Sequence, residues 1–173
     1  MHGKSSMLYL DNAATTPLLP EVRKVMINYM VDNFGNPSSI YKIGRMNKIA
    51  VEEARKSIAK TIGACPDDIF FTSGGTESDN WVLESAAESA TESDSAHIIV
   101  SAIEHPAVIN KCIQLKKRGC DVDYIKTDKN GIINTDDLIS KIRDDTKLIS
   151  VMLVNNEIGT IQPFAEIVQA GIR

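Results

Sequence analysis

The second half of the chain alternates short apolar runs with amphipathic segments, and this alternation constrains the fold more than any other feature. Apolar runs predict strands at 97–100, 122–125 and 148–154, the last nearly continuous and therefore expected to be buried on both faces. A helical pattern fills 106–118, and a short helix is expected to follow a Thr135 cap. Strands that alternate with helices favour a mainly parallel sheet, so the sequence predicts an α/β fold with flanking helices.

The first half of the chain is less regular. Residues 8–10 form a short apolar run that predicts a strand, and it leads into a polar loop. Pro20 suits a first helical position, and a longer helix is expected over about 44–62, before Gly63. The inner stripe of this longer helix would consist of Ala50, Ala54, Ile58 and Ile62.

Composition limits the class of protein. The chain has 173 residues, 43% hydrophobic and 24% charged, as expected of a globular domain with a sizeable core. A net charge of −4 argues against a nucleic-acid partner, and no apolar run is long enough to span a membrane. The lack of a signal-peptide pattern predicts a cytoplasmic protein. Cys65, Cys112 and Cys120 form no metal-binding or disulfide pattern, so we expect reduced, buried thiols and no metal site.

A glycine pair follows an apolar run at 69–72 that predicts a strand, and a helix is expected to enter from Thr76. Backbone N–H groups in such a turn can approach an anion closely, and the start of the helix adds unsatisfied donors and a partial positive charge. Ser73 and Thr76 contribute hydroxyl groups. The turn therefore has the chemistry of a phosphate cradle, although Ser-Gly-Gly-Thr also occurs as a plain turn with a threonine cap.

Three polar clusters fall at the expected carboxyl ends of strands: 73–76, Glu104 with His105, and 155–157. Ligands of parallel sheets bind outside these ends, which favours one shared site. Each cluster also has a purely structural interpretation. His105 could cap the helix that starts at Pro106, and the asparagines could form a turn.

Together these residues resemble the cysteine desulfurases, within the class V aminotransferase group of enzymes that use pyridoxal 5'-phosphate (PLP). Five motifs in the family's order and spacing carry the resemblance: YLDNAATTP at 9–17, FGNPSS at 34–39, FTSGGTES at 71–78, Glu104-His105 and VNNEIG at 154–159. The resemblance implies the PLP-dependent transferase-like fold (fold type I), of which this chain would be a truncated large domain.

The resemblance also implies roles for individual residues. Gly75 and Thr76 would bind the PLP phosphate, in agreement with the cradle chemistry. His105 would lie over the pyridine ring as the catalytic residue that exchanges protons with the substrate. Asn156 would donate a hydrogen bond to the phenolic oxygen of PLP. Loops bordering the substrate pocket would contain Asn12, Ala13, Thr15 and Asn36.

The chain departs from the family pattern in what it lacks. Tyr41 stands where the family commonly has a histidine. The family's Schiff-base lysine follows a histidine, and no His-Lys pair occurs here. None of the three cysteines occupies the position of the nucleophile. We therefore expect a leader or cloning remnant over 1–6, an N-terminal segment with active-site loops over 7–45, and an incomplete PLP-binding domain over 46–173.

For the intact protein the resemblance implies a cysteine desulfurase that removes sulfur from L-cysteine, leaving alanine and an enzyme persulfide. A homodimer and a sulfur acceptor such as an iron–sulfur scaffold are the expected partners, and the 173-residue chain alone is expected to be inactive. The alternatives are another class V aminotransferase or lyase, a non-catalytic truncated product, and a phosphate-binding or nucleotide-binding module.

Overall fold

The computed structural model describes residues 8–89 and 96–171. The chain divides into two compact units, the first ending at Phe71 and the second beginning at Thr72. The leader expected over 1–6 lies outside the described residues. The described part contains no helix long and apolar enough to cross a membrane.

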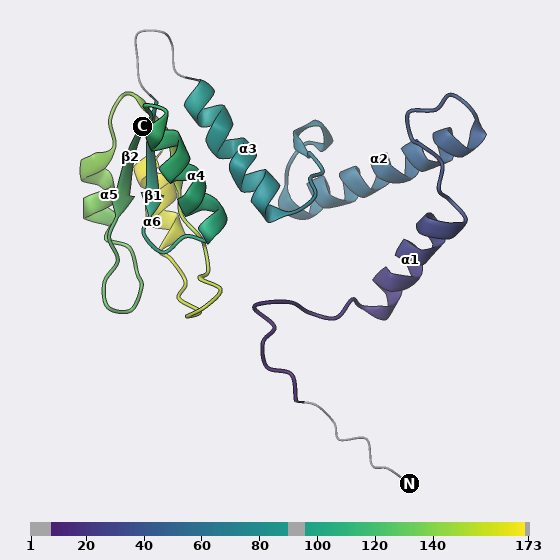
Figure 1. Cartoon of the computed structure of the whole chain (residues 1–173), viewed down its shortest axis with the longest axis horizontal. Helices are drawn as coiled ribbons and strands as arrows, with labels where there is room; N and C mark the ends of the chain where they lie inside the picture. The colour runs from purple at the N-terminus through teal and green to yellow at the C-terminus, as the bar shows by residue number, and fades with distance from the viewer. Residues whose placement is uncertain (1–7, 90–95, 172–173) are drawn as a thin grey trace. The chain divides into compact units, whose positions relative to one another are not determined.

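A three-stranded parallel sheet forms the centre of the second unit (Figure 1). Strand β1 (His97–Ser101) lies between β2 (Asp121–Ile125) and β3 (Thr146–Ser150). Ile98 of β1 is paired with Val122 on one side and with Leu148 on the other. The predicted α/β fold with a mainly parallel sheet is confirmed.

Helices cover both faces of this sheet. On one face α3 (Gly75–Glu88) and α4 (Pro106–Lys117) pack against Ile98 and Val100. On the other face α5 (Thr135–Lys141) and α6 (Phe164–Gly171) pack against Ile99. Since successive side chains of a strand point to opposite faces, β1 is buried along its whole length.

Two local expectations for this unit need correction. Strand β3 ends at Ser150, short of the predicted 154, and it is only partly buried. Among the described residues β3 pairs with β1 alone, and its other edge borders a groove lined by Val82 and Phe164, so burial on both sides is not reached. The cap of α5 is Asn134 and not Thr135, because the Asn134 side chain accepts a hydrogen bond from the Asp137 N–H at 3.0 Å.

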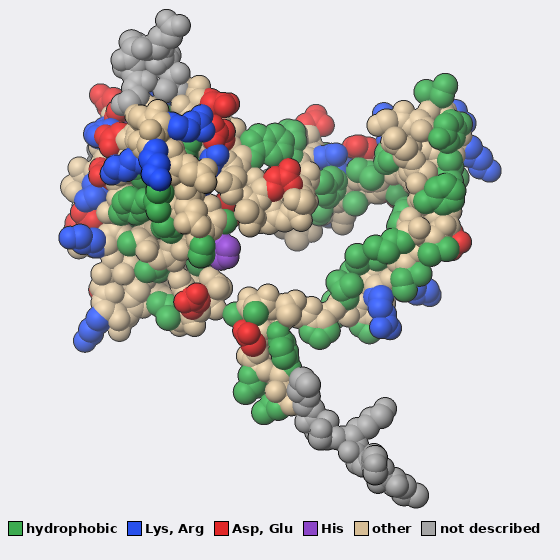
Figure 2. Space-filling model, viewed as in Figure 1, with side chains coloured by type: hydrophobic (Ala, Val, Ile, Leu, Met, Phe, Trp, Pro, Cys, Tyr) green, Lys and Arg blue, Asp and Glu red, His purple; other side chains and the backbone are tan. Residues whose placement is uncertain are grey.

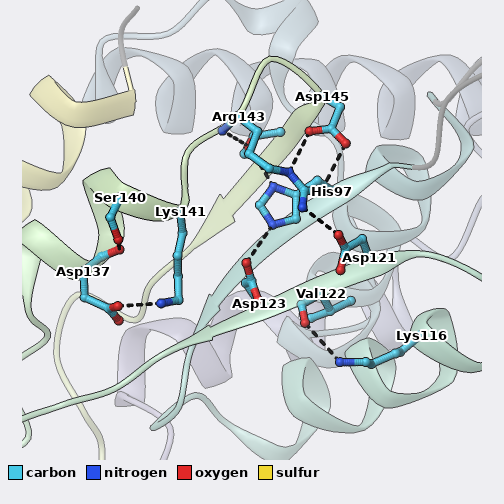
Figure 3. Close-up of polar contacts among 11 residues, drawn as sticks. His97, Lys116, Asp121, Val122, Asp123, Asp137, Ser140, Lys141, Arg143 and Asp145 are labelled. Atoms are coloured by element: carbon cyan, nitrogen blue, oxygen red, sulfur yellow. Dashed lines mark hydrogen bonds and ion pairs between the residues drawn. The ribbon is translucent and has the colours of Figure 1, made fainter.

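A network of polar side chains closes the amino ends of the strands (Figure 3). His97 is fully buried, with Nδ1 2.8 Å from the Thr146 hydroxyl and Nε2 3.4 Å from the Asp123 carboxylate. Arg143 forms ion pairs with Asp121 at 2.7 Å and with Asp145 at 2.9 Å. All three strands are therefore connected at this end by side chains as well as by the backbone.

The first unit consists of two helices and a short 3₁₀ turn. Helix α1 spans Pro20–Val31, α2 spans Lys42–Ile62, and the turn η1 spans Pro66–Asp68. Gly63 ends α2 with φ of 71°, a left-handed conformation that glycine adopts without strain, as the sequence predicts. The buried Asn47 side chain donates to the carbonyl groups of Asn33 and Gly35, which fixes the loop before α2.

Several expectations for the first unit are wrong. Residues 8–10 and 69–72 are not strands, because among the described residues no second strand pairs with either segment. The predicted inner stripe of α2 is largely exposed, at Ala54, Ile58 and Ile62. Within the described chain α2 therefore does not bury its apolar face. Hydrophobic side chains cover much of the visible surface of α1 and α2 (Figure 2).

The three cysteines are free, as predicted, but they are not all buried. Cys112 of α4 is fully buried in the core, and burial raises the pKa of its thiol to about 11. Cys120 is half-buried and Cys65 is exposed. Cys65 directly precedes η1 as its N-cap residue.

Candidate functional site

The polar clusters of the second unit lie where the sequence places them, around the carboxyl ends of the strands. Glu104 and His105 follow β1, and Asn155 and Asn156 follow β3. Helix α3 contacts both β1 and β3 and begins with the glycine pair. We take these three segments as the candidate site.

The turn before α3 is held by a side chain from within the helix. Both the N–H and the hydroxyl of Ser73 donate to one carboxylate oxygen of Glu77, each at 2.6 Å. These hydrogen bonds hold the pKa of Glu77 below its usual value, the hydroxyl having the larger effect. The Thr72 and Ser78 hydroxyl oxygens lie 2.7 Å apart and connect the turn to the first turn of α3. Glu77 therefore holds Ser73, the residue before the glycine pair, in place. The space next to Gly74 and Gly75 stays free.

The first N–H groups of α3 remain open. Among the described residues no acceptor pairs with the N–H groups of Gly74, Gly75, Thr76 or Glu77. A Cβ atom placed on either glycine would meet no atom within 4 Å, so the room above them is not needed by the chain itself. Thr76 is exposed beside them. Open donors, free space and a hydroxyl at a helix start fit a phosphate group.

His105 is the N-cap of α4, which confirms its structural interpretation but leaves half of the ring available. Its Nδ1 accepts a hydrogen bond from the Ala107 N–H at 3.1 Å. In the neutral imidazole this bond assigns the proton to Nε2, because only one ring nitrogen can then be an acceptor. The side chain is exposed. His105 thus offers an oriented ring with an Nε2–H donor.

The two asparagines after β3 differ in their surroundings. Asn155 is 8% exposed, and its Oδ1 accepts from the N–H groups of Glu157 and Ile158 at 2.9 and 3.1 Å. The turn interpretation is therefore correct for Asn155. Asn156 is exposed, and among the described residues its side chain forms no hydrogen bond. Its amide is free to bind a ligand.

Sequence reasoning missed how the loops of this site are joined. Glu104 accepts hydrogen bonds from Ser101 and Met152, and Asn155 donates to the Ile103 carbonyl. Both residues stand immediately before a predicted site residue. Only this position, directly before His105 and Asn156, indicates Glu104 and Asn155 in the sequence. It does not reveal which groups they bind.

The predicted substrate-pocket residues lie in the first unit. Asn12 and Ala13 occupy an exposed turn closed by the Ala14 N–H to the Asp11 carbonyl at 3.2 Å, and Thr15 follows it. Asn36 Oδ1 accepts from the Ser38 N–H at 2.9 Å. Tyr41, the departure from the family pattern, is the N-cap of α2. The pocket role of all four residues stays a prediction.

Among the described residues, no group of three or more histidine, cysteine, aspartate or glutamate side chains could hold a metal ion. The open groups at the strand ends are the N–H groups at the start of α3, the His105 ring and the Asn156 amide. These groups fit an anionic, aromatic ligand that carries a phosphate at one end.

The sequence is similar to those of known cysteine desulfurases. A 51% identical relative, cysteine desulfurase IscS of Methanosarcina thermophila, is matched over 95% of this chain and 40% of its own length. IscS of Dictyoglomus turgidum is 49% identical over 92% of this chain and 40% of its own length. The chain thus spans about two fifths of these relatives.

Solved structures of similar proteins have the same fold. A NifS-like protein superimposes with a TM-score of 0.89 at 38% identity, over 92% of this chain and 44% of that one. A structure titled SspA in complex with cysteine gives 0.89 at 37% identity, over 94% of this chain and 47% of that one. The match is to PLP-dependent fold type I proteins, as the resemblance implied. The model of the Aminotransferase class-V family matches residues 8–172, and the chain belongs to this family of PLP-dependent enzymes.

Proposed function

We propose that this chain is the part of a PLP-dependent cysteine desulfurase that holds the phosphate and the ring of the cofactor. The start of α3 carries the proposal, since its N–H groups are open and the space above Gly74 and Gly75 is free. The similarity to the desulfurase relatives supports the assignment of the reaction.

Each site residue has a task that its surroundings permit. The N–H groups of Gly75 and Thr76 and the Thr76 hydroxyl would bind the phosphate, assisted by the partial positive charge of the helix start. His105 would stack on the pyridine ring and hold a proton at Nε2. Asn156 would donate its free amide to the phenolic oxygen. Bound PLP supplies an electron sink that weakens the bonds at the substrate α-carbon.

In the proposed reaction L-cysteine loses its sulfur to a thiolate of the enzyme and leaves as alanine. Cys112 is not proposed as that thiolate, because it is fully buried and its raised pKa keeps it protonated. The proposal assigns neither the accepting thiolate nor the lysine that binds PLP to a residue of this chain.

The remaining parts of the proposal concern the surroundings of the protein. The proposed protein is a homodimer and lies in the cytoplasm. It passes the sulfur to an iron–sulfur scaffold or to another acceptor. The exposed apolar side chains of α1 and α2 support an interface, and three free cysteines support a reducing compartment. Asn12, Ala13, Thr15 and Asn36 are proposed to border the pocket for L-cysteine.

Equilibrium binding to the 173-residue chain tests the cradle directly. PLP should bind more tightly than pyridoxal, which lacks the phosphate. Thr76→Val should weaken PLP binding about tenfold, the value of one hydrogen bond to a charged group, and leave pyridoxal binding unchanged. Thr61→Val, which alters an exposed threonine of α2, is the matched control. Equal affinities for PLP and pyridoxal would exclude the cradle.

The reaction itself is tested with the full-length protein that contains this chain. Incubation with L-cysteine should yield alanine and transferred sulfur in equal amounts, and His105→Ala should abolish both. Transamination products without alanine would instead indicate another class V activity.

A further inference from the structure

The carboxylate of Glu104 joins the loops that follow two neighbouring strands. Its Oε1 accepts a hydrogen bond from the Ser101 hydroxyl at 2.5 Å and another from the Met152 N–H at 2.5 Å. Ser101 is the fully buried last residue of β1, whereas Met152 follows the end of β3. Hydrogen bonds to a carboxylate are shorter and stronger than those between neutral groups. Glu104 therefore holds the chain leaving β1 against the chain leaving β3.

Asn155 makes the reciprocal connection from the other loop. Its Nδ2 donates to the Ile103 carbonyl at 3.0 Å, while its Oδ1 accepts from the N–H groups of Glu157 and Ile158. The Asn155 side chain thus binds backbone groups of both loops, and its burial protects these bonds from water.

The residues that follow these two are the exposed His105 and Asn156. A single peptide unit separates each of them from a side chain that is fixed to the opposite loop. The backbone positions of His105 and Asn156 relative to one another are therefore set by Glu104 and Asn155, and not by contacts of their own exposed side chains.

We propose that Glu104 and Asn155 are positioning residues: their paired connection between the loops after β1 and β3 sets the separation of His105 and Asn156 about the ring of bound PLP. The inference rests on the proposed function. Neither Glu104 nor Asn155 touches the cofactor in this account, and each acts through the residue that follows it.

Conservative and disruptive variants separate this role from simple loss of stability. Glu104→Ala removes the acceptor of both the Ser101 hydroxyl and the Met152 N–H. Glu104→Gln keeps an oxygen at the same reach, so it should rescue most of the loss. Asn155→Asp keeps the oxygen that accepts from Glu157 and Ile158 but replaces the donor to Ile103 by a second oxygen.

A matched control removes a carboxylate with two partners elsewhere in the same unit. Glu84 of α3 forms ion pairs with Lys111 and Arg118, and both partners lie outside the two loops. Glu84→Ala should lower stability without altering the site.

The first measurement needs no cofactor. Amide hydrogen exchange of Met152, followed by NMR in the 173-residue chain, should be about tenfold faster in Glu104→Ala than in the wild type, because its acceptor is lost. Glu104→Gln and Glu84→Ala should leave the Met152 rate nearly unchanged. An unchanged rate in Glu104→Ala would overturn the connection on which the inference depends.

The second measurement uses the full-length protein loaded with PLP. Glu104→Ala and Asn155→Asp should each weaken PLP binding about tenfold and move the pH at which the visible absorption of the bound cofactor changes. In the double variant the losses should not add, since each single change already breaks the paired connection. Glu104→Gln should retain both properties.

The outcomes separate this inference from the proposed function. If Glu104→Ala accelerates Met152 exchange but leaves the affinity and the absorption profile as in the wild type, the inference is overturned and the proposed function stands. If the wild-type protein takes up no PLP, the proposed function fails and the inference fails with it.

Discussion

At the amino ends of the three strands polar side chains connect the strands, whereas at the carboxyl ends two side chains join loops and other polar groups stay open. His97, Thr146 and Asp123 connect the strands at the amino ends. Glu104 and Asn155 connect loops at the carboxyl ends. The same sheet therefore has one end whose polar groups serve stability and one end whose polar groups are available to a ligand.

The two described histidines make the difference plain. His97 is the first residue of β1 and its ring is fully buried, whereas His105 follows the strand and its exposed ring has only Nδ1 engaged. A buried imidazole with partners on two neighbouring strands is costly to remove, whereas an exposed helix cap contributes little. The comparison teaches that residue type alone does not distinguish a histidine that is buried in the fold from one whose ring stays open to a ligand.

The largest effect is expected from removing the buried histidine. His97→Ala should lower the free energy of unfolding by about 2–4 kcal/mol, because a cavity forms and Thr146 and Asp123 lose their partner. His105→Ala should lower it by only about 1 kcal/mol, the value of an N-cap. Urea denaturation of the 173-residue chain measures both, and similar losses for the two variants would break the comparison.

The next effect concerns pH and the buried thiol of Cys112. Burial raises its pKa from an ordinary value of 9.0 to about 11, so the folded state keeps a proton that the unfolded state loses. Between these values the folded state binds more protons, and stability must therefore fall as the pH rises. The loss should reach roughly 2–3 kcal/mol near pH 11, at about 1.4 kcal/mol for each unit of pKa.

Urea denaturation at pH 8 to 11 measures this loss. The exposed Cys65 supplies the control, since Cys65→Ser should retain the full alkaline loss. Cys112→Ala should remove the part of the loss that this thiol causes, whereas the raised pKa values of Cys120 and Tyr124 should leave a remainder. Thiol labelling of the native protein should follow the exposure of the three cysteines. Cys65 should react first and Cys112 last. Fast labelling of Cys112 would contradict its burial.

A smaller effect distinguishes two helix starts at the carboxyl ends. Asn134 closes the start of α5 with its own side chain, whereas the start of α3 is left open. Asn134→Ala should cost about 1 kcal/mol of unfolding free energy and leave PLP affinity unchanged. Thr135→Ala should change neither quantity, and a larger loss from Thr135→Ala would restore the cap expected from sequence.

That cap shows where sequence reasoning succeeds and where it stops. Periodicity correctly located β1 and α4, because these elements depend on local patterns of apolar residues. The glycine pair predicted the start of α3 to within one residue, at Thr76 where the structure has Gly75. Asn134 and Thr135 are adjacent and both can cap, so their spacing could not decide between them. The strand expected at 69–72 is absent because pairing requires a partner that a local pattern cannot reveal.

The candidate site was also predictable only in part: the sequence indicated its residues but not the contacts that hold them. Spacing and glycine chemistry placed Gly75, Thr76, His105 and Asn156 near strand ends without any coordinates. The bonds from Glu104 to Met152 and from Asn155 to Ile103 span 48 and 52 residues of sequence. Such contacts arise only when parallel strands bring distant loops together, and a single sequence carries no signal of their partners.

The smallest effect on stability is expected from Gly75→Ala. An added Cβ would meet no atom within 4 Å, and Gly75 is helical, so alanine should leave the free energy of unfolding unchanged or raise it by at most about 1 kcal/mol. Affinity for PLP should nevertheless fall, because the methyl group occupies the space proposed for the phosphate. Thermal unfolding and equilibrium binding measure the two quantities on the same sample.

Gly63→Ala is the matched control for this last change. Its Cβ would also meet open space, but Gly63 has φ of 71°, so alanine should destabilise the chain by about 1 kcal/mol without affecting PLP. Loss of PLP affinity in Gly75→Ala and loss of stability in Gly63→Ala would show two different reasons for a glycine. At Gly75 the free space would be needed by a ligand, and at Gly63 the left-handed backbone would need glycine. Loss of stability at Gly75 with unchanged PLP affinity would show instead that the start of α3 belongs, like the amino ends of the strands, to the structural part of the molecule.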